Sequence, residues 1–237
     1  MWAGPRYAHH LFVHGQALAA ELQRTRLAPA ARISVLAHGW YDCRTQWAGA
    51  QDEEPHTVLF FGRIKAYKGL EYLVEAMPLV QAAVPDVHFL VVGGEGDMAP
   101  YRRLPGAQAA AVTWVNRFVE DAEAAAFFRR ASLVVLPYTD GSASGVIAAA
   151  YAFARPVIAT RVGSLPEAVV DGVTGLLIPP RDAAALAAAI SGLLSDDPRR
   201  RALGAAGRQW AQQHLSWADI AHQTVAVYRQ LAWKSAG

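Results

Sequence analysis

Cysteine, lysine and long hydrophobic runs are all scarce in this 237-residue chain. Cys43 is the only cysteine, so no disulfide can form within the chain, and a reducing, cytoplasmic setting is the simplest expectation. Three lysines accompany nineteen arginines without a strongly basic tract, so we expect no nucleic acid partner. The longest apolar run, residues 145–154, has about half of the roughly 20 residues that a membrane-spanning helix needs. We expect no integral membrane segment, although peripheral contact with a membrane stays open.

Apolar residues are abundant, at 53% of the chain against 18% charged residues, which is typical of a globular protein. From residue 57 onward they gather in short runs that are rich in β-branched and aromatic residues and do not alternate cleanly. Such runs predict strands buried on both faces of a parallel sheet. The runs are 57–61, 87–92, 111–114, 132–137, 156–160 and 175–180.

Helix patterns separate these runs, at 70–83, 121–130, 182–194, from Asp197 onward, and 217–233. Asp197 followed by Pro198 is typical of a capping residue and the first residue of a helix. The alternation of strand and helix predicts an α/β fold with a Rossmann-like, doubly wound parallel sheet. Residues 1–54 differ: they predict two strands, within 10–15 and 32–39, around a helix at 16–26, followed by a polar linker at 48–55.

Basic residues follow the first run of the predicted sheet. Gly62 would end the strand, Arg63 would leave its carboxyl end, and Lys68 would precede the helix that begins near Leu70. Ligands bind at that edge of doubly wound sheets, and a helix N-terminus attracts anions. The pattern predicts a pocket for a phosphate group, in which Lys65 either contributes or points to solvent. A solvated basic loop is the alternative interpretation.

Three later stretches fall at the same predicted edge. The glycine-rich stretch 91–97 is a weak signal by itself, because it lacks a complete dinucleotide-binding or Walker pattern. Ser144 and Gly145 precede a helix predicted from about Val146 to Ala154, which indicates a second start suited to an anion. Glu167, after the strand at 156–160, would either contact a ligand or cap a short helix.

Taken in order, these motifs resemble the donor-binding half of GT-B glycosyltransferases, especially glycosyltransferase family 4 (group 1). The resemblance covers about residues 55–233, and its motifs are specific as a set. They are Phe61-Gly62-Arg63, Lys68-Gly69, Gly93-Gly94-Glu95-Gly96, Ala154-Arg155-Pro156-Val157, Pro166-Glu167 and Asp171-Gly172-Val173-Thr174-Gly175.

The resemblance implies a nucleotide-sugar donor as substrate, no cofactor, no metal, and transfer with retention of anomeric configuration. Arg63 and Lys68 match the pair that holds the diphosphate in the family and would act as the catalytic groups. The expected donor-binding residues are Gly62, Gly94, Arg117, Phe118, Val119, Ser144, Gly145, Val146 and Glu167.

Two departures from the family pattern limit these expectations. Gly141 and Ala149 stand where family members commonly carry glutamates that contact the donor. Residues 1–54 are expected to be a remnant of the N-terminal domain plus a linker, residues 55–215 the nucleotide-sugar-binding domain, and residues 216–237 a helix that crosses to the N-terminal domain. The acceptor domain would then be missing, supplied by a partner chain, or replaced through self-association.

Two other functions stay open. The chain could be a non-catalytic nucleotide-binding or interaction module derived from a glycosyltransferase, as Gly141 and Ala149 suggest. It could also be a different doubly wound protein, such as an epimerase or an oxidoreductase. A dehydrogenase would need a glycine fingerprint in its first strand–helix turn, where this chain instead carries cations.

Overall fold

A computed structural model describes residues 4–47, 53–141 and 143–235 of the protein. The strands are β1 (Leu11–Val13), β2 (Ile33–Val35), β3 (Thr57–Phe61), β4 (His88–Gly93), β5 (Ala111–Asn116), β6 (Leu133–Leu136), β7 (Val157–Thr160) and β8 (Gly175–Ile178). The longer helices are α2 (Gln16–Arg24), α3 (Leu70–Ala83), α6 (Asp121–Arg130), α7 (Gly145–Ala152), α9 (Ala183–Leu194), α10 (Asp197–His214) and α11 (Trp217–Ser235). The short helices are α1 (Gly4–Tyr7), η1 (Ala30–Arg32), η2 (Asp42–Trp47), η3 (Ala66–Lys68), α4 (Ala99–Arg102), α5 (Pro105–Ala109) and α8 (Leu165–Ala168).

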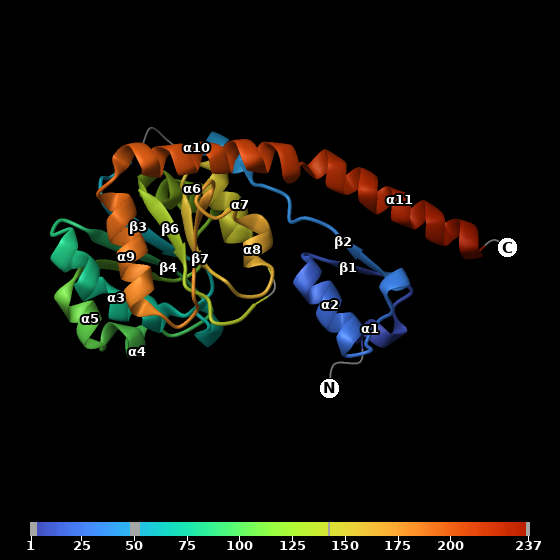
Figure 1. Ribbon diagram of the computed structural model, residues 1–237, viewed down its shortest axis with the longest axis horizontal. Coiled ribbons are helices and arrows are strands. Elements are labelled where there is room, and N and C mark those ends of the chain that lie inside the picture. The colour runs from blue at the N-terminus through green and yellow to red at the C-terminus, as the bar shows by residue number, and fades with distance from the viewer. Residues whose placement is uncertain (1–3, 48–52, 142, 236–237) are drawn as a thin grey trace.

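The larger body is a six-stranded, wholly parallel sheet in the order β5-β4-β3-β6-β7-β8, with helices on both faces (Figure 1). One apolar cluster joins the sheet to α3 and α9, and includes Phe60, Met77 and Ile190. A second cluster on the opposite face joins it to α6 and α7, and includes Phe128 and Tyr151. Strands β3, β6 and β7 are buried almost throughout because both of their faces are covered. The predicted doubly wound α/β fold is confirmed.

A smaller unit, the front piece (residues 4–35), stands beside this body (Figure 1). In it β1 pairs in parallel with β2, and α2 lies between them in the chain. The following segment is fixed to the junction between α10 and α11, because Trp40 donates its backbone N–H to the Leu215 carbonyl and accepts a bond from the Trp217 indole. Helix α11 then runs out along the front piece, where Tyr228 meets Phe12 edge to face. No described helix is both long and apolar enough to cross a membrane.

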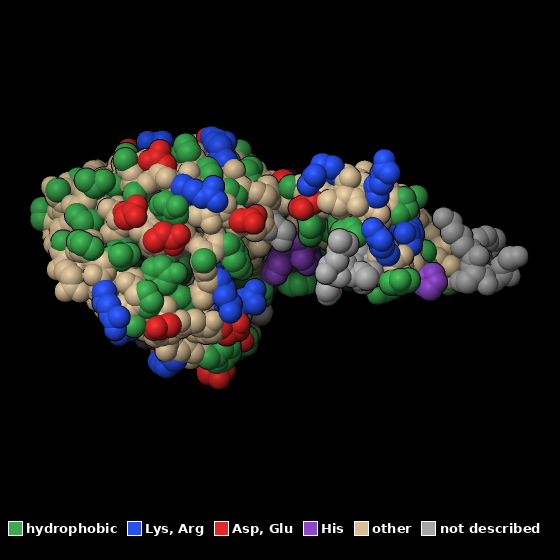
Figure 2. Space-filling model, turned by 90° about the horizontal axis from the view of Figure 1, so that it is seen from below, with side chains coloured by type: hydrophobic (Ala, Val, Ile, Leu, Met, Phe, Trp, Pro, Cys, Tyr) green, Lys and Arg blue, Asp and Glu red, His purple; other side chains and the backbone are tan. Residues whose placement is uncertain are grey.

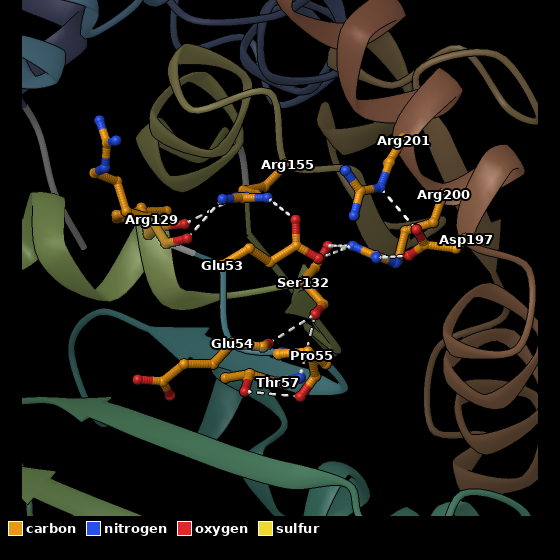
Figure 3. A network of polar contacts seen from close by, with 11 residues as sticks. Glu53, Glu54, Pro55, Thr57, Arg129, Ser132, Arg155, Asp197, Arg200 and Arg201 are labelled. Carbon is orange, nitrogen blue, oxygen red and sulfur yellow. Dashed lines mark hydrogen bonds and ion pairs between the residues drawn. The ribbon is translucent and has the colours of Figure 1, made fainter. Parts of the chain in front are cut away.

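A network of ion pairs lies at the amino ends of β3 and β6 (Figure 3). The Glu53 carboxylate pairs with both Arg155 and Arg200, and Arg200 also donates to the Ser132 carbonyl at 3.1 Å. Beside it, Glu54 accepts two hydrogen bonds from the Arg130 guanidinium, at 2.7 and 3.1 Å. The carboxyl-terminal part of the predicted linker is therefore bound tightly to the larger body, while residues 48–52 lie outside the described residues.

Several details of the sequence prediction were wrong. Helix α10 is capped by Asp196, which accepts a bond from the Arg199 amide, and not by Asp197. Asp197 is the first helical residue and pairs with Arg200 and Arg201. The short helices α1, α4, α5, η1, η2 and η3 were not predicted, because segments of three to six residues carry too little apolar periodicity.

Candidate functional site

The sheet has a switch point between β3 and β6. From β3 the chain adds β4 and β5 on one side, and β6, β7 and β8 then extend the other side. Crevices at such points, outside the carboxyl ends of the strands, are where ligands bind in this type of sheet. A hollow of about 320 Å³, here called the central cavity, opens at this place. Its lining comes from the end of β3 and the turn η3 that follows it, from α6, from the start of α7 with the two residues before it, and from the segment after β2.

The predicted residues at the end of β3 contribute to this cavity. Gly62 has a φ of 125°, in a region that residues with a side chain rarely adopt, and its N–H donates to the Val92 carbonyl. This turn brings Arg63 out at the sheet edge, where its guanidinium lies 3.8 Å from the Glu95 carboxylate. Both side chains are more than half exposed, so water screens that pair and Arg63 stays available to an anion.

Lys68 lies deeper in the same cavity and is only 8% exposed. It ends the turn η3 and is followed by Gly69, whose φ is 64° and where a Cβ atom would lie 1.9 Å from the Pro137 carbonyl oxygen. The ammonium donates to the Tyr138 hydroxyl at 2.5 Å and forms no ion pair within the described part of the chain. Burial, aided by the nearby Arg63 charge, lowers the pKa of Lys68 from its ordinary 10.5 to about 8.

The start of α7 forms another part of the lining of the central cavity. Ser144 caps the helix by accepting a bond from the Val146 amide at 3.4 Å, and Gly145 is the first helical residue. A Cβ atom at Gly145 would lie 3.1 Å from the His38 ring and 3.2 Å from the Tyr41 hydroxyl. The absent side chain therefore leaves a narrow approach to the first amides of the helix.

The predicted contribution of α3 is not found, because neither Gly69 nor Leu70 lines the central cavity and both residues are buried. Pro137 stands against the start of that helix. Among the described residues, the helix start that faces the two cations is therefore that of α7. Lys65 is exposed and absent from the lining, which agrees with the alternative that it points to solvent.

A second hollow of about 220 Å³, here called the side cavity, adjoins the central cavity through Gly62 and Arg63. The predicted residues Gly94, Arg117, Phe118 and Val119 line it. The Arg117 guanidinium is held by two hydrogen bonds to Glu123, of 2.7 and 2.5 Å. That bonding raises the pKa of Arg117 and lowers that of Glu123.

Two features of the side cavity suit a flat ligand. Phe118 is 77% exposed, so one face of its ring is open to a stacking partner. A Cβ atom at Gly94 would lie 3.0 Å from the Phe118 amide nitrogen, so a side chain at this position would narrow the cavity.

Glu167 lies outside the lining of both cavities. Its two carboxylate oxygens accept bonds of 2.8 and 3.0 Å from the backbone amides of Gln16 and Ala17. These are the first amides of α2, whose N-cap residue Gly15 has no side chain to offer. Glu167 thus joins the larger body to the front piece by capping a helix of the latter, and its contact with a donor stays a prediction.

Histidines gather at the junction between the larger body and the front piece, where Figure 2 shows them in purple. The His14 and His38 rings lie 5.4 Å apart. His14 is hydrogen-bonded to the backbone carbonyl of Leu36, and His38 to that of Gly39. In the described part of the chain no three histidine, cysteine or acidic side chains gather as a metal site would require.

The structure adds site residues that the sequence analysis did not single out. The Tyr67 and Tyr138 rings lie beside the Lys68 ammonium. Phe128 on α6 also lines the central cavity, as do His38 and Tyr41 from the segment after β2. The two positions of the missing glutamates also lie nearby: Ala149 lines the central cavity, and Gly141 adopts a φ of 137° beside the Tyr67 ring. Tyr138 stands two residues after the end of β6 at Leu136, and its position just beyond a strand end was the one signal that could have marked it.

Three comparisons with known proteins agree with this arrangement. Phosphatidyl-myo-inositol mannosyltransferase of Mycobacterium leprae is 34% identical over 178 residues, covering 74% of this chain and 47% of the relative. Sucrose-phosphate synthase from Thermosynechococcus elongatus has a TM-score of 0.79 at 32% identity, covering 97% of this chain and 60% of that one. The Anabaena protein HepE, solved with UDP-glucose, has a TM-score of 0.80 at 19% identity, covering 96% of this chain and 65% of that one, which bears on the fold alone.

The larger body has the fold of the C-terminal, Rossmann-like domain of GT-B glycosyltransferases. The chain spans about half the length of the curated relatives that it matches. The sequence family described as glycosyl transferases group 1 matches residues 55–196, which include the strands, turns and helix starts around both cavities. The chain therefore belongs to the glycosyl transferases group 1 family.

Proposed function

We propose that this chain binds the nucleotide-sugar donor of a glycosyl transfer reaction and positions its diphosphate in the central cavity. The observation that carries the proposal is that Arg63 and Lys68 both line one cavity whose described lining contains no carboxylate. Lys68 has no acidic partner among the described residues, and Arg63 has only the exposed Glu95 at 3.8 Å. Together with the capped start of α7 they form a site that a diphosphate would neutralise. The nucleoside would extend into the side cavity, over Phe118.

In this proposal the two cations stabilise the leaving group. When the bond between the anomeric carbon and the diphosphate oxygen breaks, the electron pair stays with the diphosphate, and its negative charge increases. Arg63 and Lys68 would then interact more strongly with the transition state than with the bound donor, which is the condition for catalysis. Retention of anomeric configuration and a reaction without metal are part of the proposal, and both follow from the family resemblance.

Two relatives support a function in sugar transfer. Sucrose-phosphate synthase shares this fold at 32% identity over nearly the whole chain, and phosphatidyl-myo-inositol mannosyltransferase is 34% identical over 178 residues. Neither identifies the base or the sugar that this chain would take. The acceptor is likewise open, because the relatives are about twice as long as the matched region.

We propose that the acceptor is held with the help of a second polypeptide, which is either a different partner chain or a second copy of this chain. Exposed apolar side chains on α11, Trp217, Val225 and Tyr228, would be covered in such an assembly. Sedimentation velocity over a range of concentrations tests self-association. A monomer at every concentration would leave the separate partner chain as the version to pursue.

A non-catalytic module is the second candidate, and Gly141 and Ala149 favour it. Without carboxylates at these positions, the described lining of the central cavity offers hydroxyl and imidazole groups but no carboxylate to accept hydrogen bonds from a sugar or a ribose. Such a module would still bind a nucleoside diphosphate. It would differ in leaving glycosyl transfer by a complete assembly unchanged when Arg63 or Lys68 is replaced.

Isothermal titration of the chain with UDP, GDP and ADP tests the shared part of both candidates. We expect one of these ligands to bind at pH 7 with a Kd below about 1 mM, as two charge-assisted contacts would provide. Arg63→Gln should weaken that binding, whereas Lys65→Gln, which removes an exposed lysine outside the cavity, should leave it unchanged. A folded sample that binds none of the three at millimolar concentration would contradict the proposal.

A further inference from the structure

Lys68 belongs to a chain of hydrogen bonds that runs beside the central cavity through the buried Tyr138. Its ammonium donates to the Tyr138 hydroxyl at 2.5 Å, and that hydroxyl lies 3.0 Å from the Ser144 hydroxyl. Ser144 in turn accepts a bond from the Val146 amide. The chain thus connects the cation after β3 to the first turn of α7 through side chains that follow β6.

Tyr138 is held rigidly in this chain. It is 2% exposed, and its backbone carbonyl accepts a 2.6 Å bond from the Thr160 hydroxyl. The Lys68 ammonium also lies 3.8 Å from the centre of the Tyr138 ring, so the ring face and the hydroxyl both stabilise the cation. Burial raises the pKa of Tyr138, so the phenol stays neutral and cannot act as a counter-ion.

Lys68 differs from the other buried basic residues in the partner of its charged group. Arg155 and Arg200 are also largely buried, but both pair with the Glu53 carboxylate. Lys68 has a neutral hydroxyl in the place of a carboxylate, which fixes the position of the ammonium and leaves its charge uncompensated. A diphosphate could then neutralise Lys68 without first displacing an acidic side chain.

We infer that Tyr138 is the positioning residue for Lys68, holding its ammonium toward the diphosphate while Ser144 links the same chain to the start of α7. The inference rests on the proposed function for the identity of the anion, but the hydrogen-bond chain exists without it. Because the Tyr138 hydroxyl accepts a hydrogen bond from the ammonium, it can donate its own hydrogen bond to the Ser144 oxygen. The Ser144 hydroxyl can then donate a hydrogen bond to a phosphate oxygen.

The inference has a direct consequence for pH dependence. The groups that face Lys68 are Arg63 after β3, Tyr67 on η3, Tyr138 and Ser144 after β6, and His38 and Tyr41 after β2. None of them carries a negative charge, so removing the Tyr138 hydroxyl takes away the described hydrogen-bond acceptor of the ammonium. The pKa of Lys68, already lowered to about 8, should therefore fall further, and the charge would be lost near neutral pH.

Carbon-13 NMR of lysine side chains tests this without any ligand. The chain has only the three lysines Lys65, Lys68 and Lys234, and the Lys68 signal is assigned by its loss in Lys68→Met. We expect Lys68 to titrate near pH 8 in the unchanged chain and about one pH unit lower in Tyr138→Phe.

Tyr151→Phe is the matched control. It also removes a buried tyrosine hydroxyl, which donates to the Thr174 hydroxyl at 2.8 Å and lies outside the lining of the central cavity. It should leave the Lys68 titration unchanged. An unchanged Lys68 midpoint in folded Tyr138→Phe would overturn the inference, whether or not the chain binds nucleotides.

Titration with UDP, GDP and ADP between pH 6.5 and 9.5 adds the functional measurement. We expect affinity to fall as pH rises through about 8, and Tyr138→Phe to weaken binding about tenfold at pH 7, as loss of a bond to a charged group would. If Tyr138→Phe binds as well as the unchanged chain over the whole range, the inference fails and the proposed function stands. If the unchanged chain binds nothing, the proposed function fails, and the NMR midpoints decide the inference.

Ser144→Ala provides a second variant should Tyr138→Phe fold poorly, which circular dichroism would reveal. It breaks the link to α7 and keeps the bond between Lys68 and Tyr138. We expect a smaller downward shift of the Lys68 midpoint and a smaller loss of affinity. An unchanged midpoint together with unchanged affinity would show that the chain of hydrogen bonds does not act on Lys68.

Discussion

Cations at the two ends of the parallel strands have different kinds of partner. At the amino ends, Arg155 and Arg200 share the carboxylate of Glu53, and Arg200 also pairs with Asp197 (Figure 3). Their other donors reach the backbone carbonyls of Phe128, Arg129 and Ser132. At the carboxyl ends, Lys68 has a hydroxyl partner and no described carboxylate, and Arg63 has only an exposed partner at 3.8 Å.

The presence or absence of a buried carboxylate partner distinguishes cations that stabilise the fold from cations that an anionic ligand would neutralise. A buried pair with satisfied hydrogen bonds fixes segments that are distant in the chain, such as residues 53 and 200, and loses stability when one partner is removed. A buried cation without a counter-charge carries a desolvation cost, and an anionic ligand can offset that cost when it binds. The comparison predicts that substitutions at the two ends will change stability in opposite directions.

Glu53→Gln should have the largest effect. It leaves Arg155 buried next to a neutral amide and leaves Arg200 with only the half-exposed Asp197, and breaking a buried pair in this way typically costs about 3–5 kcal/mol of unfolding free energy. Urea denaturation measures the loss. Glu54→Gln is the matched control, because the Glu54 side chain is 45% exposed in its pair with Arg130 and should cost about 1 kcal/mol or less. Equal losses in the two variants would remove the distinction between them.

Lys68→Met should act in the opposite sense on stability. Removing a buried, uncompensated charge is expected to raise the unfolding free energy at pH 7 by about 1–3 kcal/mol. The same substitution should abolish detectable binding of nucleoside diphosphates. Denaturation and titration calorimetry on one preparation give both values, and a destabilised Lys68→Met would contradict the idea that Lys68 is present for a ligand.

Arg63→Gln should separate binding from stability. The Arg63 side chain is 60% exposed, so its loss should change the unfolding free energy by less than about 0.5 kcal/mol. Affinity for a nucleoside diphosphate should fall about tenfold or more, since a charge-assisted contact is removed. A variant that binds normally would mean that Arg63 does not face the diphosphate.

The pH dependence of stability gives the finest test of the comparison. The pKa of Lys68 is about 8 in the folded protein and ordinarily 10.5, so between these values the unfolded chain binds more protons than the folded one. The free energy of unfolding therefore rises with pH across that window. Below pH 8 the buried charge of Lys68 destabilises the folded protein to its full extent. The stability advantage of Lys68→Met should shrink as pH rises from 8 to 10.5. An advantage that stays constant would show that the charge of Lys68 is not its source.

Much of the fold could be predicted because its elements depend on local patterns. The apolar run 57–61 became β3, and the amphipathic stretches 70–83 and 121–130 became α3 and α6 with the same bounds. The cap of α10 was displaced by one residue because Asp196 and Asp197 are equally suitable and only tertiary contacts choose between them. The short helices α4 and α5 carry prolines near their starts and too few turns for a periodic signal.

The candidate site likewise contains positions that local sequence patterns predict and contacts that they do not predict. The positions of Arg63, Lys68 and Ser144 follow from strand ends, and parallel strands bring such ends to one edge. The bond between Lys68 and Tyr138 joins residues 70 positions apart, and the capping of Gln16 by Glu167 joins residues 151 apart. No local pattern encodes such pairs, so the position of Glu167 at the front piece became apparent only in three dimensions.

A crystal structure of the chain with a bound nucleoside diphosphate tests the central claim most directly. We expect the phosphate oxygens to accept hydrogen bonds from the Lys68 ammonium, the Arg63 guanidinium and the amides at the start of α7, with Lys68 still bonded to Tyr138. A diphosphate bound away from the central cavity, or bound there without contact to Lys68, would contradict the account.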